Sequence, residues 1–143
     1  MRINQNQKQF QLEVVGYQYP YAEDKYDRNW LRVKVHVVEG EKKYETVDPF
    51  LLAEDISHMI EWFQVLPNPT YTELDFIEPN LCFAYVGEKG GLFEIDIQLT
   101  LEITPPWATN DTHVMKFFIT EIEREEIVRS LHRQGEKFPE RTE

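Results

Sequence analysis

The sequence predicts an α+β fold, with one twisted, mostly antiparallel sheet of about six or seven strands and two helices packed on one face. Apolar and polar residues alternate over residues 92–104, which is typical of a strand with one buried and one wet face. Two segments, 48–66 and 120–133, carry apolar residues at helical spacing. Strands and helices do not alternate along the chain, as a parallel sheet would require.

The first third of the chain predicts three strands, over residues 10–17, 31–38 and 44–47. The first two have an apolar residue at every second position, which is the period of a half-buried strand. Residues 19–29 are polar and predict a loop between them. Gly40 lies in a hairpin turn signal before the third strand.

A first helix is predicted to begin at Asp48 and Pro49, because Asp is a favoured N-cap and Pro suits the first helical position. Pro67 and Pro69 should end it. Its apolar residues form one wide stripe, as expected of a helix that packs on a sheet. The stripe consists of Leu52, Ile56, Met59, Ile60, Phe63 and Leu66.

The second half of the chain predicts four more strands, over residues 73–77, 81–86, 92–104 and 113–119. A closing helix should begin after Thr120, which can form a capping box with Glu123. It should run to about Arg133, with Gly135 as its candidate C-cap.

The 143 residues suit a single domain, so we expect one domain over residues 1–143, with residues 1–8 and 136–143 loose. The single Cys82 excludes an intramolecular disulfide and fits a reducing compartment. The polar start of the chain lacks the apolar region of a signal peptide, and no apolar run reaches the length of a membrane span. We therefore expect a soluble, cytoplasmic protein.

The chain is strongly acidic: 26 Asp and Glu residues against 15 Lys and Arg residues give a formal net charge of −11. Such a surface repels nucleic acids and anionic membranes and attracts basic proteins. Many small proteins are acidic only for solubility, so the charge favours a basic protein partner without requiring one. We expect no nucleic-acid or membrane partner.

The wet face of the long strand is the first candidate for binding a partner. Glu94, Asp96 and Glu102 should lie on one side of it, where alternate residues are spaced about 7 Å apart. Such a stripe could bind Lys or Arg side chains. The alternative is an ordinary solvated face, paired across strands with Arg32 and Lys34.

A second candidate is the acidic loop with Glu23, Asp24 and Asp27. Its spacing does not match a calcium-binding EF-hand loop, so a solvated loop or a docking surface is favoured over a metal site. Trp62, partly off the helix stripe, and Trp107, in a loop, are candidate aromatic anchors because exposed Trp is enriched at binding hot spots. Rim or core packing is an equal alternative for both.

No catalytic group of residues is visible, so we expect no enzyme, no metal and no cofactor. The four histidines are not within metal-ligand spacing of one another or of Cys82, which reads as an inert thiol in an apolar strand. Two other functions stay open. One is a module that encloses an unknown small molecule, and the other is an enzyme whose acids are brought together by the fold.

Two segments in the N-terminal third resemble the start of the WapI-like immunity proteins: residues 10–20 (FQLEVVGYQYP) and residues 26–33 (YDRNWLRV). The Asp-Pro-Phe-Leu segment at 48–51 and the long strand that ends near Pro105 are similar in layout. The resemblance covers residues 10–133, and the matching motifs are structural in character.

The resemblance implies a small bacterial protein that protects its cell from the toxin domain of a wall-associated, contact-dependent toxin. It implies a fold and a general role, and no toxin-contacting residue. Because such toxins are often nucleases with basic substrate-binding surfaces, an acidic protein could neutralise one by stoichiometric binding.

Overall fold

The computed structural model describes residues 1–142 and shows an α+β fold with two four-stranded antiparallel sheets in that range. The first sheet has the order β1-β2-β3-β4 and consists of β1 (Arg2–Gln5), β2 (Lys8–Tyr17), β3 (Trp30–Glu39) and β4 (Lys42–Leu52). The second has the order β5-β6-β7-β8 and consists of β5 (Glu73–Leu74), β6 (Leu81–Lys89), β7 (Leu92–Thr100) and β8 (Thr112–Ile119). The helices are α1 (Lys25–Asn29), α2 (Ala53–Gln64) and α3 (Glu121–Lys137), with a 3₁₀ turn, η1, at Leu101–Ile103.

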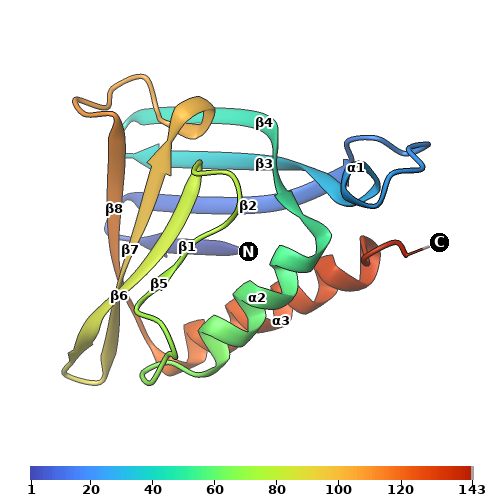
Figure 1. Cartoon of the computed structure of the whole chain (residues 1–143). Helices are drawn as coiled ribbons and strands as arrows, with labels where there is room; N and C mark the ends of the chain where they lie inside the picture. Colours follow the sequence, from blue (N-terminus) through green and yellow to red (C-terminus); the bar gives the residue numbers. More distant parts are fainter. Residues whose placement is uncertain (143) are drawn as a thin grey trace.

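The α+β class is confirmed, but the prediction of one sheet of six or seven strands is wrong. The strands of the two sheets cross steeply and enclose a shared core (Figure 1). Phe83 of β6 packs edge-on against Phe10 of β2 at 6.4 Å and against Phe63 of α2 at 5.3 Å between ring centroids. Alternation along a strand predicts which side is buried and carries no information on which sheet the strand joins.

A side-chain amide joins the two sheets at their outer strands. Gln5 of β1 donates from Nε2 to the Phe118 carbonyl of β8 at 2.6 Å and accepts from the Phe118 N–H at 2.8 Å. The Lys8 ammonium donates to the Lys116 carbonyl beside it. The Gln5 amide thus binds β8 as a neighbouring strand would.

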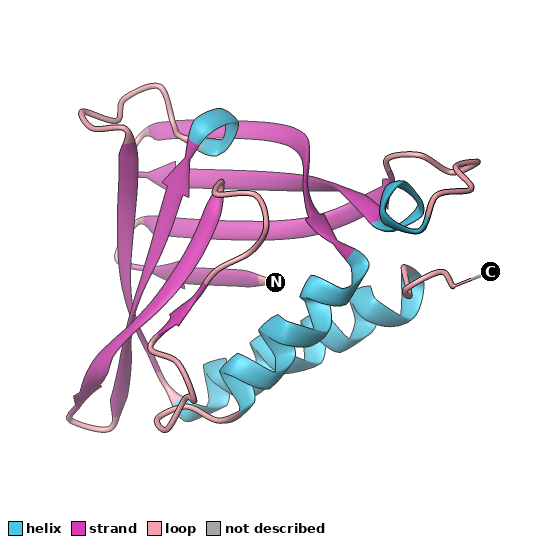
Figure 2. Ribbon diagram, in the orientation of Figure 1, coloured by secondary structure: helices cyan, strands magenta, loops and turns pink. Residues whose placement is uncertain are grey.

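The two long helices lie side by side where the two sheets diverge (Figure 2). Met59 and Phe63 of α2 and Leu131 of α3 are fully buried. Gly135 was expected to cap α3 but lies inside it, and the helix ends at Lys137. A Cβ at Gly135 would lie 3.5 Å from Ile56 Cγ2, an ordinary van der Waals distance, so Gly135 lies close to Ile56 where the two helices meet.

The prediction that a helix begins at Asp48-Pro49 is wrong, because β4 continues to Leu52. Asp48 instead accepts a hydrogen bond from the Thr46 hydroxyl within the strand. Pro49 is tolerated because β4 lies at the edge of its sheet. The capping carboxylate of α2 is Asp55, which accepts the Leu52 N–H at 2.8 Å.

Other predicted boundaries also shift. The predicted strand 92–104 ends at Thr100, where Leu101 takes a positive φ of 59° and starts η1. The predicted strand 73–77 is reduced to β5, and the predicted loop 19–29 contains α1.

Both ends of the described chain are tied to the fold, whereas we expected them to be loose. Residues 2–5 form β1, and Met1 is buried beside Leu12. At the other end, the Arg141 guanidinium donates to the carbonyls of Tyr19, Pro20 and Arg28. Its backbone N–H donates to Asn29 Oδ1 at 2.7 Å, and the Asn29 amide donates back to the Arg141 carbonyl at 3.1 Å.

Candidate partner-binding surface

Glu94 and Asp96 of β7 lie together on the outer face of the second sheet, as predicted, and both bind Lys116 of β8. Lys116 Nζ lies 2.8 Å from Asp96 Oδ1, directly opposite in register, and 2.5 Å from Glu94 Oε2. Lys89 Nζ is 3.6 Å from the other Glu94 oxygen. The hydrogen bond from Lys116 lowers the pKa of Glu94, and the hydrogen bonds to Asp96 and Glu94 raise the pKa of Lys116.

Glu102 does not join this stripe, because β7 ends before it. It lies exposed in η1, where its carboxylate accepts from the Asn80 amide at 3.1 Å. Arg32 and Lys34, considered as cross-strand partners, belong to β3 in the other sheet, and Lys34 lies 3.9 Å from Glu45. The negative charge of the predicted stripe is therefore largely paired within the molecule.

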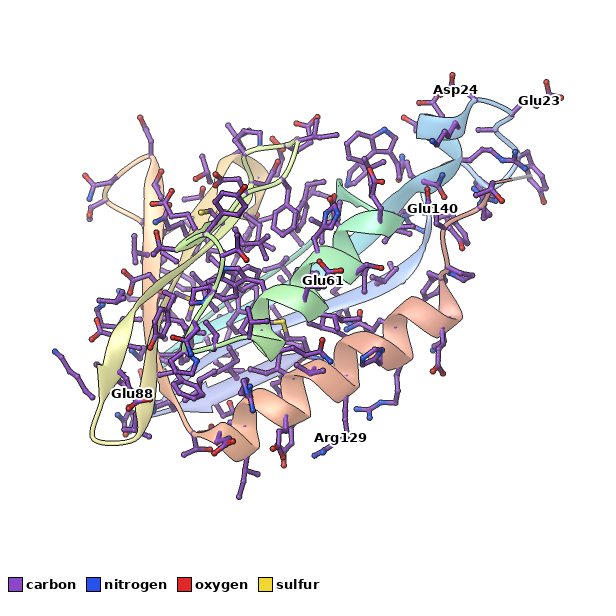
Figure 3. All side chains as sticks on the ribbon, turned by 60° about the horizontal axis from the view of Figure 1, so that its bottom comes forward. Glu23, Asp24, Glu61, Glu88, Arg129 and Glu140 are labelled. Carbon is purple, nitrogen blue, oxygen red and sulfur yellow. The ribbon has the colours of Figure 1, made fainter. Side chains whose placement is uncertain are left out.

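The acidic loop projects at one end of the molecule. Glu23, Asp24 and Asp27 are exposed, and Asp24 Oδ1 accepts the Asp27 N–H at 3.2 Å. Figure 3 shows Glu23 and Asp24 at the outer tip, with Glu140 from the C-terminal segment nearest to them among the labelled acids. This end combines acidic residues from both ends of the chain.

The two tryptophans considered as anchors are packed into the protein. Trp62 is 6% exposed, stacks edge-on against Phe63 and donates to the Tyr71 carbonyl at 3.0 Å. Trp107 is half-buried and donates to Glu39 Oε1 at 3.1 Å, the same oxygen that His113 contacts. Both indole N–H groups already have acceptors inside the chain.

A groove between α2 and α3, which sequence reasoning missed, brings four unpaired acids of the described residues around one hollow. It has a volume of about 520 Å³. Its lining includes four carboxylates and no Lys or Arg: Glu54, Glu61, Glu136 and Glu140. Among the described residues, no hydrogen bond or ion pair engages any of these four carboxylates. A sequence signal existed, since the exposed face of α2 contains acids and no Lys or Arg.

A second groove of about 490 Å³ lies on the other side of α2 and shares Glu61 with the first. Its lining is more apolar and includes Trp62, Val65, Tyr71 and Leu74. Tyr71 is 75% exposed. The exposed face of α2 therefore lies between two hollows.

Among the described residues, one group of side chains lies close enough together to be considered as metal ligands. Pairing of β5 with β6 brings Glu73, Asp75 and Cys82 together, with their candidate ligand atoms within 4.8 Å of one another. Burial, followed by the hydrogen bond and charge of Asp75, raises the pKa of the Cys82 thiol to about 12. The thiolate is the form that binds metals, and the raised pKa favours the protonated thiol. This group is therefore a weak candidate for a metal site.

None of the helices in the part of the chain that the structure describes is long and apolar enough to cross a membrane.

The chain was compared with known families, curated proteins and solved structures. A search of the curated proteins and a search of the solved structures found no match. The sequence matches the immunity protein WapI-like family over residues 1–139, which is nearly the whole chain and includes both sheets and both long helices. The resemblance seen in the N-terminal third is confirmed, and the chain belongs to the immunity protein WapI-like family.

Proposed function

We propose that this protein neutralises a cognate toxin domain by binding it in fixed stoichiometry, without catalysis, in the cytoplasm of the bacterium that makes it. The family match over residues 1–139 carries the proposal. An immunity role requires only that the toxin's working surface be covered.

The charge of the chain supports a basic partner. With a net charge of −11, the protein attracts a cationic surface over a distance of several ångströms and accelerates the encounter. Nucleases have such surfaces, because they bind phosphate backbones. The toxin domain is therefore proposed to have a basic surface and to be a nuclease.

The loop acids Glu23, Asp24 and Asp27 are proposed to take part in docking, because they are exposed at the end of the molecule where Glu140 also lies. Glu94, Asp96 and Glu102 contribute to the overall field, although Lys116 already neutralises part of it. Trp62 and Trp107 are proposed to support neighbouring surface residues instead of serving as exposed anchors.

The small-molecule alternative is less well supported. A ligand site needs polar groups of complementary kinds converging on an enclosed hollow. The charged side chains that line the α2–α3 groove are all carboxylates, and His132 is the other titratable side chain in its lining. This pattern fits a cationic protein surface better than a mixed small molecule.

The test uses the toxin domain encoded beside the gene for this chain. The purified domain should bind this protein at a fixed ratio, with an association rate that falls at least about tenfold between low and high salt, since the Debye length shrinks from about 30 Å to about 3 Å. Co-expression should protect cells from the toxin. A rate indifferent to salt would contradict electrostatic docking, and failure to protect would contradict the immunity role.

A further inference from the structure

We propose that the groove between α2 and α3 binds Lys or Arg side chains from a basic segment of the toxin. This inference rests on the proposed function and names the surface and the chemistry of the contact. The groove combines an apolar floor with unpaired charge of one sign.

The floor and the rim of the groove differ in chemistry. Ala53, Ile56 and Ile60 of α2 line it, together with Phe138 and Pro139 from the segment after α3. The four glutamates Glu54, Glu61, Glu136 and Glu140 surround these apolar groups, and Figure 3 shows Glu61 and Glu140 along the α2 side of the molecule. A long basic side chain has the complementary form, with an aliphatic stem and a charged head.

The charges of the rim are available to a partner. Glu94 and Asp96 on β7 are neutralised by Lys116, whereas the four groove carboxylates form no ion pair with any residue that the structure describes. Lys25 lines an adjoining hollow with Glu54 and Glu140 but makes no ion pair with either. Glu136 also lies in the last turn of α3, where the negative end of the helix dipole favours a cation. A carboxylate at that position is unfavourable for the helix itself, and a bound cation would relieve the repulsion.

The groove is held open before any partner arrives. Gly135 of α3 faces Ile56 of α2 where the two helices pack together. Arg141 anchors the chain just after Glu140 to the carbonyls of Tyr19, Pro20 and Arg28. The wall formed by Phe138, Pro139 and Glu140 is thereby fixed, and a preformed site reduces the entropy lost on binding.

The experiment compares two variants that lose the same number of charges. The groove variant carries Glu54→Gln, Glu61→Gln, Glu136→Gln and Glu140→Gln. The control variant carries Glu41→Gln, Glu88→Gln, Glu125→Gln and Glu126→Gln, which are exposed and lie outside the groove. Binding to the toxin domain encoded beside the gene is measured by calorimetry, after circular dichroism has shown that both variants keep the fold.

The groove variant should bind on the order of 100-fold more weakly, because charges paired with a partner in a contact carry much of its free energy. The control should weaken by less than about fivefold, as exposed charges do. Ser57→Trp, which places a large side chain in the groove without changing charge, should also weaken binding, and Ser57→Ala should not.

Three outcomes would overturn the inference. Equal losses in the groove and control variants would mean that charge acts only at long range. Full binding by Ser57→Trp would mean that the groove stays unoccupied. A dimer of the isolated protein that the groove substitutions dissociate would assign the groove to a second copy. In each case the wild type still binds the toxin, so the proposed function stands; if the wild type does not bind, the proposed function itself fails.

Discussion

Glu94 is 5% exposed, yet it carries a charge that the fold stabilises. Its two oxygens face Lys116 and Lys89, and the hydrogen bond from Lys116 is the main cause of its lowered pKa. Because a lowered carboxylate pKa means that folding favours the charged form, Glu94 contributes stability above its ordinary pKa of 4.5. That contribution is lost as the pH falls through the lowered, folded-state pKa.

Replacing Lys116 by Met should therefore destabilise the protein at neutral pH, because it leaves Glu94 and Asp96 without their shared cation. The loss should shrink as the pH falls through the lowered, folded-state pKa of Glu94, where that carboxyl group takes up a proton. Urea unfolding of the wild type and the variant at several pH values checks this.

Lys89→Met is the matched control, because Lys89 is 3.6 Å from Glu94 and its side chain is 75% exposed. It should cost much less stability. A loss for Lys116→Met that is the same at pH 7 and at acidic pH would instead assign the effect to packing of the lysine stem.

At the scale of single residues, the sequence predicted part of this arrangement. The alternation of β7 correctly put Glu94 and Asp96 on the polar face. It did not predict Lys116 as their partner, because the register of β7 against β8 is set by packing and turns at a distance from both. Nor did it predict the groove carboxylates, since Glu54 and Glu140 are brought together by the packing of two helices and an anchored tail.

At the scale of elements, the contact between α2 and α3 includes a glycine inside a helix. Gly135 has helical geometry, and a Cβ there would meet Ile56 Cγ2 at 3.5 Å, an ordinary van der Waals distance. Glycine at this position loses more conformational entropy on folding than alanine would, although a methyl group would fit there.

Gly135→Ala should raise the free energy of unfolding by roughly 0.5–1 kcal/mol, and Tm by roughly 2–4 °C, because alanine has less freedom to lose on folding. Thermal unfolding followed by circular dichroism measures the change. Gly40→Ala is the control of opposite sign, since Gly40 has a φ of +65° that alanine adopts poorly. A destabilised Gly135→Ala variant would show that Ile56 cannot adjust.

Helix and strand boundaries were predicted best where no tertiary contact opposed the local sequence signal. The Thr120 capping box correctly marked the start of α3, and both of its hydrogen bonds form. Asp48-Pro49 gave a comparable signal but lies in β4, because pairing with β3 continues to Leu52. The pairing of β4 with β3 overrides the local helix signal there, and no pattern in residues 48–52 predicts that pairing.

At the scale of the whole molecule, the two sheets share one core with the helices. Phe83 contacts both Phe10 and Phe63, so neither sheet can bury its inner face without the other elements. The sequence predicted the class and the two long helices. It did not predict the division into two sheets, because the choice depends on contacts between segments far apart in the chain.

We expect one cooperative unfolding transition, because a single hydrophobic core includes residues of both sheets and both long helices. Far-UV circular dichroism, which follows backbone structure, and near-UV circular dichroism, which follows aromatic packing, should give coincident melting curves. Two separated transitions would show that part of the structure is stable alone.

The amide of Gln5 has a consequence for behaviour at high concentration. A strand such as β8, at the end of its sheet, normally exposes backbone groups to which a strand of another molecule can add. Here the Phe118 N–H and carbonyl are occupied by Gln5, and the Lys116 carbonyl by Lys8. Addition of another strand is thereby hindered at this end of β8 from within the chain, and the Phe118 amide hydrogen should exchange slowly with solvent despite its place at the end of a sheet.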